Sequence, residues 1–494
     1  MDPVALVREL AAIEGRAAGT DAERRAARLL ARRLRDQGRE PRTETFWTRP
    51  AWALVHAVLC AAGVAGSVVA VDHPVTGTIV LGVAIVLFAG DLSGRLPLLR
   101  RLTPERASQM VVAPTPTAQR GAASGGSRAR RRRAAASATD QTKGASPAAA
   151  VGQGSSGAER GAADLAGPGP AAALLPGTSA ATRPRRAKAA ARAQAAAAAR
   201  GTEPDPPAPA PARPTPAPRV TLLLTAAVDV PRLGAGERGG FAVAQARVRR
   251  VLGGMLPGPS GWTLIALVVV IVVAAARIAG ADGTGAGVLA LVPTAVLIVL
   301  FGHFLDAALQ TAGPGANADA SAAAAVLAVA QELDRDPPRA LRVEVVLAGC
   351  GGALAAGMRR EVRALRRGGL RAEQVAVVHL HPCGAGTPAW WTREGLVLAL
   401  RYHPRLRALA AEVAAAHPEL EARSHESRGT SGARAARALR WPAIAVGAID
   451  ARGVAPRAGA QEDTADAIDP DALAATVAFT VALIRRLDED LARS

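Results

Sequence analysis

The sequence predicts an α/β fold, a mixed sheet covered by helices, together with four transmembrane helices in two hairpins. Two observations support this fold class. Short β-branched segments alternate with amphipathic helices, as in residues 341–348 followed by 359–367, and this alternation is typical of a sheet covered on both faces. Two pairs of long apolar runs interrupt that pattern. The 494 residues, half of them hydrophobic, are enough for a sizeable core.

The composition argues against nucleic acid as a partner. A net charge of +19 favours phosphate binding in general. Here, however, arginine accompanies abundant alanine, glycine and proline, which fits a GC-rich coding bias, and aromatic residues reach only 3%. Few side chains are therefore available to stack on bases. Cys60, Cys350 and Cys383 form neither a disulfide framework nor a CxxC pair, so a reducing compartment is expected.

Two helices are expected within residues 3–38, on either side of a loop at 15–20. The second has a capping box from Thr20 to Glu23, leucines along one face and Gly38 at its end. Two strands are expected further along this part of the chain, at residues 108–113 and 219–226.

The apolar runs predict two membrane hairpins. The first pair covers residues 51–71 and 75–90, and the second covers 262–276 and 288–305. Neither run of the first pair has a polar face, which argues against the alternative of two buried core helices. The first run also lies too far inside the chain for a cleaved signal peptide.

Arginine is crowded into the first fifty residues and into residues 95–250, whereas the two hairpin turns carry almost none. The positive-inside rule therefore places the N-terminus, the middle segment and the C-terminal half in the cytoplasm. We expect a multi-pass protein of a bacterial-type inner membrane, with both termini cytoplasmic and the lipid bilayer as a partner.

Residues 114–218 are rich in alanine, proline, glycine, serine and arginine without apolar periodicity, and they are interpreted as a disordered basic linker. The arginine cluster that begins at Arg128 and ends at Arg133 is a candidate contact for anionic lipid head groups. This cluster has two alternative interpretations. It is a solvated run of charge that only fixes the membrane topology, or it contacts nucleic acid.

The segment 315–357 organises the second half of the chain. A small-residue loop leads into a helix that Ser321 is expected to cap, and a buried strand at 341–348 precedes a glycine-rich turn. The last helix begins with Asp469 as its N-cap and Pro470 at its first position. The elements expected between these two regions are a strand at 374–380, a helix at 405–415 and a strand at 442–446.

The loop GANADAS, which begins at Gly315, and the strand that follows it resemble the M28 family of zinc aminopeptidases. That family has a GA-x-D-x-x-SG loop followed by a strand that ends in GAEE. The segments VTLLLTAAVD and QEDTADAID are also similar to family motifs. The resemblance implies an M28-like domain split into these parts: a first part (1–50), hairpin one (51–92), a continuation with a strand (93–113), the linker (114–218), a strand and connector (219–260), hairpin two (261–306) and the main part (307–494).

The same resemblance implies that most of the metal site is missing. Asp229, Asp463 and Thr464 match the family pattern and are vestigial positions. The metal-ligand and general-base positions of the family fall instead on Ala227, Ala318, Gly351, Gly352, His381 and Gly459. We therefore expect no catalytic residue and no cofactor in a pseudopeptidase that acts as a binding or scaffold module, with a protein partner that the sequence does not identify.

Two other functions remain open. His381 is the candidate ligand of a rebuilt metal site, because His379 shares its strand face. Cys383 continues the same period of two if Pro382 does not turn the chain, and Cys350 ends the expected neighbouring strand. With zinc or copper there, the chain would be an active metal-dependent aminopeptidase or hydrolase. Alternatively, it is a membrane-structural protein that recruits partners through its basic linker.

Two further groups of residues have more than one interpretation. Trp390 and Trp391 would line the cleft, the core or a membrane interface. The residue types of a serine hydrolase are present, but no GxSxG motif accompanies them; these residues are Ser424, His425, Ser431 and Asp450.

Overall fold

The computed structural model describes residues 1–116, 220–232, 257–281 and 283–493, with a few single positions between 233 and 256. All of these belong to one compact unit. Nearly all of the predicted linker, including Arg128 to Arg133, lies outside the described residues.

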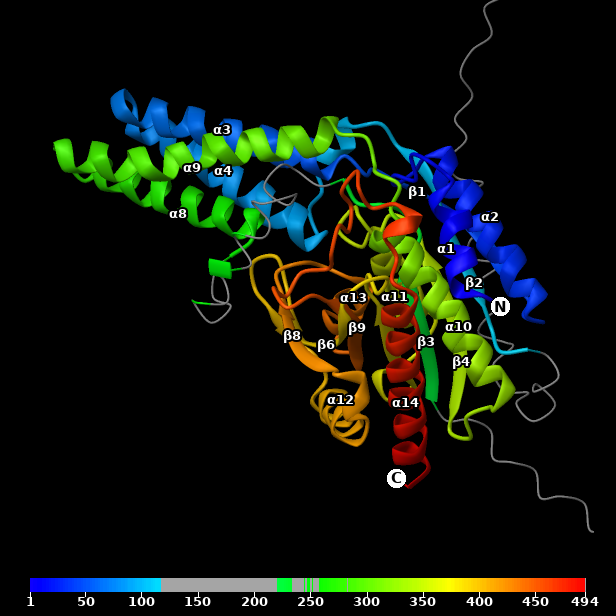
Figure 1. Cartoon of the computed structure of the whole chain (residues 1–494). Helices are drawn as coiled ribbons and strands as arrows, with labels where there is room; N and C mark the ends of the chain where they lie inside the picture. The colour runs from blue at the N-terminus through cyan, green and yellow to red at the C-terminus, as the bar shows by residue number, and fades with distance from the viewer. Residues whose placement is uncertain are drawn as a thin grey trace, which may run out of the picture. The chain divides into compact units, whose positions relative to one another are not determined.

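A mixed sheet forms the centre of the described structure (Figure 1). The strand order is β1-β2-β4-β3-β5-β9-β6-β7, and β8 pairs with β6. Strands β4, β3, β5 and β9 run parallel, so their carboxyl ends meet at one edge. The strands are β1 (Arg42–Thr48), β2 (Arg106–Ala113), β3 (Val220–Ala227), β4 (Leu341–Ala348), β5 (Val375–Leu380), β6 (Thr387–Glu394), β7 (Leu400–Arg401), β8 (Arg423–Ser427) and β9 (Ala443–Ile449).

Helices cover both faces of the sheet, as predicted (Figure 1). One face packs against α1 (Pro3–Ala11), α2 (Asp21–Asp36), α10 (Ser321–Arg335), α12 (Pro404–Ala416) and α14 (Pro470–Arg493). The other packs against α11 (Ala356–Arg367) and α13 (Gly432–Arg437). The short turns are η1 (Leu99–Leu102), η4 (Ala316–Ala320), η5 (Ala372–Gln374), η6 (Pro418–Leu420) and η7 (Ala465–Ala467).

Strands β6, β7 and β8 are absent from the sequence prediction. β7 has only two residues, and β8 (RSHES) is polar throughout, so neither has the apolar alternation that identifies a strand. β6 places Trp390 and Trp391 on opposite faces of the sheet, where both are buried. Trp390 stacks on Phe479 of α14. These tryptophans are therefore core residues, and neither is exposed at a membrane interface.

Two of the predicted helix caps differ in the structure. Thr20 accepts a hydrogen bond from the Glu23 amide at 3.2 Å, but the Glu23 carboxylate binds the Gly19 amide and not Thr20. Ser321 does not cap α10, because the turn η4 runs directly into this helix. The cap at Asp469 is confirmed, since its Oδ1 accepts from the amides of the first turn of α14 at 2.9 and 3.3 Å.

Four apolar helices lie side by side, and each is long enough to span a membrane (Figure 1). They pack closely through small residues: a Cβ added at Gly63 would lie 2.5 Å from Leu267 Cδ2, and one at Gly77 would lie 2.4 Å from Ala70 Cβ. The helices are α3 (Trp52–Asp72), α4 (Pro74–Ser93), α8 (Pro259–Ile278) and α9 (Thr284–Leu309). Both predicted hairpins are therefore present.

Candidate functional site

A cavity of about 190 Å³ lies at the carboxyl ends of β3, β4 and β5. Parallel strands direct the residues that follow them toward such an edge, which is where binding sites form in α/β proteins. The polar and small residues that matter most in its lining are Asp229, Asp319, Gly351, Gly352, His381 and Ser431. The topology thus brings together several of the positions that the sequence analysis singled out.

Asp229 is bound by the backbone of the turn after β4. Its two carboxylate oxygens accept hydrogen bonds from the amides of Gly351 at 2.5 Å and Gly352 at 3.0 Å. Complete burial raises the pKa of Asp229 to about 6, and these two amides with the charge of Arg16 oppose the rise. The carboxylate therefore holds the turn in place.

The two glycines leave no room for the glutamates of the M28 pattern. A Cβ at Gly351 would lie 2.4 Å from Ala227 Cβ, and a Cβ at Gly352 would lie 2.8 Å from Pro231 Cα. Both distances are shorter than van der Waals contact, so any side chain at these positions requires the backbone to move.

The carboxylate of Asp319 lies in a π-helical turn beside the cavity. In η4 the amide of Ala320 donates to the carbonyl oxygen of Gly315 at 3.2 Å, which accommodates one residue more than an α-helical turn. As a result Asp319 lines the cavity beside Ala318. That a metal-ligand position of the family falls on Ala318 stays a prediction.

Arg16 pairs with Asp319 inside the protein. Their Nη1 and Oδ2 atoms are 2.6 Å apart, and both side chains are 1% exposed. Arg16 also donates from Nη2 to the carbonyl oxygens of Pro314 and Gly315, so it holds the loop that leads into η4. Burial raises the pKa of Asp319 to about 8; Arg16 opposes this rise, and the charges of Asp229 and Asp463 add to it. Sequence reasoning missed Arg16, since nothing local distinguishes it from the many surface arginines.

Asp463 stabilises the same loop from the other side. It accepts hydrogen bonds from the amides of Asn317 at 2.5 Å, Ala318 at 3.0 Å and Gly459 at 3.0 Å. Burial raises its pKa, and these amides oppose the rise. Thr464, the next residue, is exposed and makes no side-chain cap for η7.

Glu23 of α2 is buried beside the start of the turn that follows β4. It is fully buried; its Oε1 accepts from Ser108 Oγ at 2.9 Å and from the Cys350 amide at 2.8 Å. Its Oε2 accepts from the Gly19 amide at 2.8 Å. Burial and the nearby charge of Asp229 raise the pKa of Glu23 to about 8.

These raised pKa values predict how stability changes with pH. Between the unfolded carboxyl pKa of about 4.3 and the folded value, the folded chain keeps protons that the unfolded chain releases, so stability falls as pH rises. The buried His379, whose pKa burial lowers to about 3, opposes this only below its unfolded value of about 6.5. We therefore expect the Tm of the full chain in detergent to fall by roughly 5 °C between pH 6.5 and 8.5.

Glu23→Gln tests the source of that slope, because glutamine does not titrate. The variant should show a shallower fall of Tm over the same pH range. Glu373→Gln, at an exposed position in η5, is the matched control and should keep the wild-type slope. Equal slopes in all three proteins would contradict the assignment to Glu23.

A second polar cluster surrounds His381. Its ring stacks on Trp391 with centroids 4.5 Å apart, and its Nε2 lies 3.5 Å from Glu394 Oε1. Glu394 ends β6 and is fully buried; its Oε2 accepts from Tyr402 and Ser431, each at 2.5 Å. Burial raises the pKa of Glu394, but the nearby His381 and the hydrogen bonds from Ser431 and Tyr402 lower it to about 2. Neither Glu394 nor Tyr402 carries a sequence signal that would have identified it.

His379 lies beside His381, as the strand period predicted, with ring centroids 5.4 Å apart. Its Nδ1 is 2.8 Å from Thr225 Oγ1, so the imidazole has a partner within the sheet. Cys350 and Cys383 do not join them, because the two cysteines are buried in separate core clusters on opposite faces of the sheet.

In the described ranges, no group of three or more His, Cys, Asp and Glu side chains is arranged to hold a metal ion. The residues at the cavity therefore do not fit a zinc centre, and a metal bound by His381 stays a prediction. The serine hydrolase residues are not assembled either: Ser431 donates to Glu394, whereas Asp450 accepts from Arg452 at 2.8 Å.

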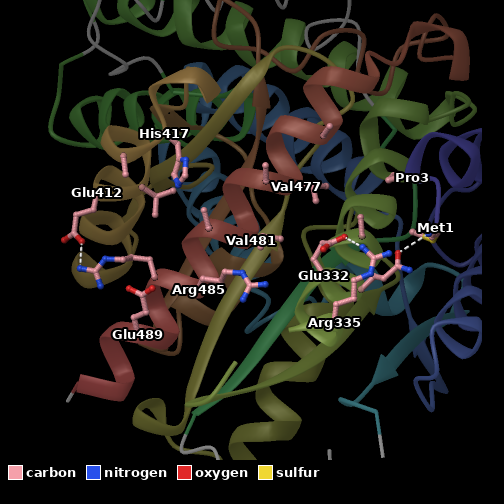
Figure 2. A pocket seen from close by; sticks show the side chains of 18 residues that line it. Met1, Pro3, Glu332, Arg335, Glu412, His417, Val477, Val481, Arg485 and Glu489 are labelled. Carbon is pink, nitrogen blue, oxygen red and sulfur yellow. Dashed lines mark hydrogen bonds and ion pairs between the residues drawn. The ribbon is translucent and has the colours of Figure 1, made fainter. Parts of the chain in front are cut away.

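A larger pocket of about 980 Å³ is lined by α10, α12, α14 and the N-terminus (Figure 2). It shares no lining residue with the cavity at the strand ends. Its wall is apolar around Val477 and Val481, and two ion pairs lie in its lining, Arg486 with Glu412 at 2.6 Å and Arg335 with Glu332 at 2.5 Å. It offers no cluster of groups for acid–base or metal chemistry, so the cavity at the strand ends is the better candidate site.

No protein-family model matches this sequence, and no curated protein matches it. Solved structures do share its arrangement in part. The glutaminyl cyclase of Porphyromonas gingivalis is similar with a TM-score of 0.45 and 11% identity, covering 99% of this chain and 97% of that chain. LapB from Legionella pneumophila has a TM-score of 0.44 and 9% identity over 98% of this chain and 71% of that one. For BSAP, a zinc aminopeptidase from Bacillus subtilis, the TM-score is 0.28 and the identity 15%, over 35% of this chain and 42% of that one. Similarities at this level carry no information about activity.

Proposed function

We propose that this chain is a membrane-embedded protein whose peptidase-like α/β domain lacks metal-dependent catalysis and acts as a binding or scaffold module. One observation carries the proposal: the carboxylates that remain at the cavity already have partners within the protein. Both oxygens of Asp229 accept from backbone amides, Asp319 binds Arg16 through Oδ2, and Asp463, outside the cavity lining, accepts from amides of the adjoining loop.

A catalytic zinc centre makes different demands. It needs carboxylate or imidazole ligands with free lone pairs and a further carboxylate that takes the proton of the bound water. Here the turn that would supply a general base consists of Gly351 and Gly352. The charge of Arg16 also partly neutralises the aspartates that a metal would otherwise neutralise. The residues of the site are therefore better suited to stabilising the cavity than to catalysing hydrolysis.

The distribution of arginine supports a location in a bacterial-type inner membrane, with both termini and the α/β domain in the cytoplasm. In this arrangement the cavity faces cytoplasmic ligands, and His381, whose side chain is 18% exposed, is the group best placed to contact one. The ligand remains unassigned.

Metal content tests the proposal directly. The full chain is purified in detergent, and its zinc and copper are measured by elemental mass spectrometry beside aminopeptidase activity on a panel of aminoacyl substrates. We expect metal at background and no hydrolysis, in the wild type and in His381→Ala alike.

The exposed His417, which pairs with Glu419, provides the control variant His417→Ala. About one equivalent of zinc or copper that His381→Ala loses and His417→Ala keeps would overturn the proposal. That outcome would support instead an active metal-dependent hydrolase with a rebuilt site at His381.

A further inference from the structure

The segment that follows α4 combines exposed leucines with arginines. Leu96, Leu98 and Leu102 are 47%, 43% and 84% exposed. Arg95 and Arg101 alternate with them and are exposed as well. Exposed leucines among arginines, directly after an apolar helix that can span a membrane, are typical of a segment that lies in the interface between lipid and water.

The basic face of α11 contacts the end of the same helix. Arg359 donates from Nη2 to the carbonyl oxygen of Leu92 at 3.1 Å, and Arg363 donates to that of Gly94 at 3.5 Å. Cations are favourable at a helix C-terminus, which explains why the two elements meet in this way. The guanidinium groups of Arg359 and Arg363 are thereby held at the C-terminal end of the apolar helix α4.

Positive charge is in excess at this position. Burial, together with the charges of Arg434, Arg100 and Arg363, lowers the pKa of Arg359 to about 10. The nearby acid, Asp91, is already bound by Arg100 at 2.6 Å and by His56 at 2.9 Å.

Other acids do not remove the excess. In the described structure no ion pair is formed by Arg95, Arg101, Arg359 or Arg363. Glu105 pairs instead with Arg49. A surface with unbalanced guanidinium groups therefore borders the apolar helices.

We propose that Arg95, Arg101, Arg359 and Arg363 bind the phosphate groups of anionic phospholipids, in the leaflet on the side of the α/β domain. A guanidinium group can donate two parallel hydrogen bonds to the oxygens of one phosphate group. Leu96, Leu98 and Leu102 would insert beside these arginines, at the boundary between the head groups and the acyl chains. The inference rests on the proposed membrane location. It assigns lipid binding to folded residues next to the bundle, whereas the sequence suggested only the cluster at Arg128 to Arg133. Because α11 follows the turn that contains Gly351 and Gly352, bound lipid would hold the cavity close to the bilayer.

The test uses the full chain in detergent and a short-chain, soluble phosphatidylglycerol, with phosphatidylcholine of equal chain length and inorganic phosphate as separate arms. Apparent affinities come from the rise of Tm with ligand concentration. We expect phosphatidylglycerol to bind most tightly. Arg95→Gln/Arg101→Gln, which changes only exposed side chains, should weaken that binding by on the order of tenfold.

Arg28→Gln/Arg32→Gln removes the same charge from exposed positions of α2 and should bind like the wild type. Arg359→Gln/Arg363→Gln should weaken binding as well, provided that its Tm without lipid shows a folded protein. Equal affinity in the Arg95/Arg101 variant and its control would overturn the proposal, as would stabilisation by inorganic phosphate equal to that by phosphatidylglycerol. Alkaline carbonate extraction of cell membranes separates the two proposals. Release of the wild type overturns the membrane location, whereas a retained protein that does not prefer phosphatidylglycerol overturns the lipid site alone.

Discussion

At a pH above about 8, where the buried Asp319 is ionised, replacing Arg16 by methionine is expected to lower the free energy of unfolding by about 3–5 kcal/mol, because the carboxylate loses its cation. The pair is 1% exposed on both sides and its atoms are 2.6 Å apart, so water does not compensate for the loss. Arg16 also binds two carbonyl oxygens of the loop before η4, and these would lose a charged donor. Thermal unfolding of the detergent-solubilised full chain, followed by tryptophan fluorescence, measures the effect.

A surface pair provides the control for this experiment. Arg33 binds Glu9, and their side chains are 37% and 39% exposed. Arg33→Met should therefore cost no more than about 1 kcal/mol. Arg16→Met/Asp319→Leu should recover part of the loss, because it leaves no buried charge unpaired. If Arg16→Met were no more destabilising than Arg33→Met, Arg16 would not be the internal cation that we infer.

Replacing Glu394 by alanine is expected to cost about 3–4 kcal/mol, since two buried hydroxyl groups lose their acceptor. Tyr402 and Ser431 both donate to Oε2 of this carboxylate, and His381 lies beside Oε1. Replacement of Glu426 by alanine is the control, because Glu426 pairs with Arg393 at a position that is 41% exposed. That change should cost less than about 1 kcal/mol.

The same carboxylate predicts a loss of stability in acid. The folded pKa of Glu394, about 2, lies below the unfolded value of about 4.3, so its contribution is complete above pH 4.3 and is lost as pH falls toward 2. In Glu394→Gln this part of the decline in Tm below pH 4.3 should be missing. A decline as steep as in the wild type would show that Glu394 is not the ionised centre of the cluster.

Both predictions depend on Arg16, Glu394 and Tyr402, none of which the sequence singled out as a site residue. Arg16 and Asp319 are 303 positions apart, and Tyr402 and Ser431 reach Glu394 from separate elements. Each partnership forms because a charge or hydroxyl buried by packing needs a complement, and that need arises only when distant segments meet. Neither the composition nor the periodicity of the sequence reveals these pairings.

Asp319 shows that a linear motif can miss a residue of the cavity lining. The linear pattern places Ala318, and not Asp319, at a ligand position of the family, whereas both residues lie in η4 and both line the cavity. The residue is thus in the cavity, although its carboxylate binds Arg16. Glu23 is a similar case, because its position in a capping box concealed its contacts with Ser108 and Cys350.

The sequence by itself determined the elements whose cause is local. The four apolar helices follow from the length of each run, the parallel strands β3, β4 and β5 from their β-branched residues, and the start of α14 from Asp469 and Pro470. Only the tertiary structure decided the partners at the cavity, the polar strand β8 and the contact between α11 and the end of α4. The physical reason is that helix and strand propensities act over a few residues, whereas pairing of buried charges depends on which segments the packed core brings together.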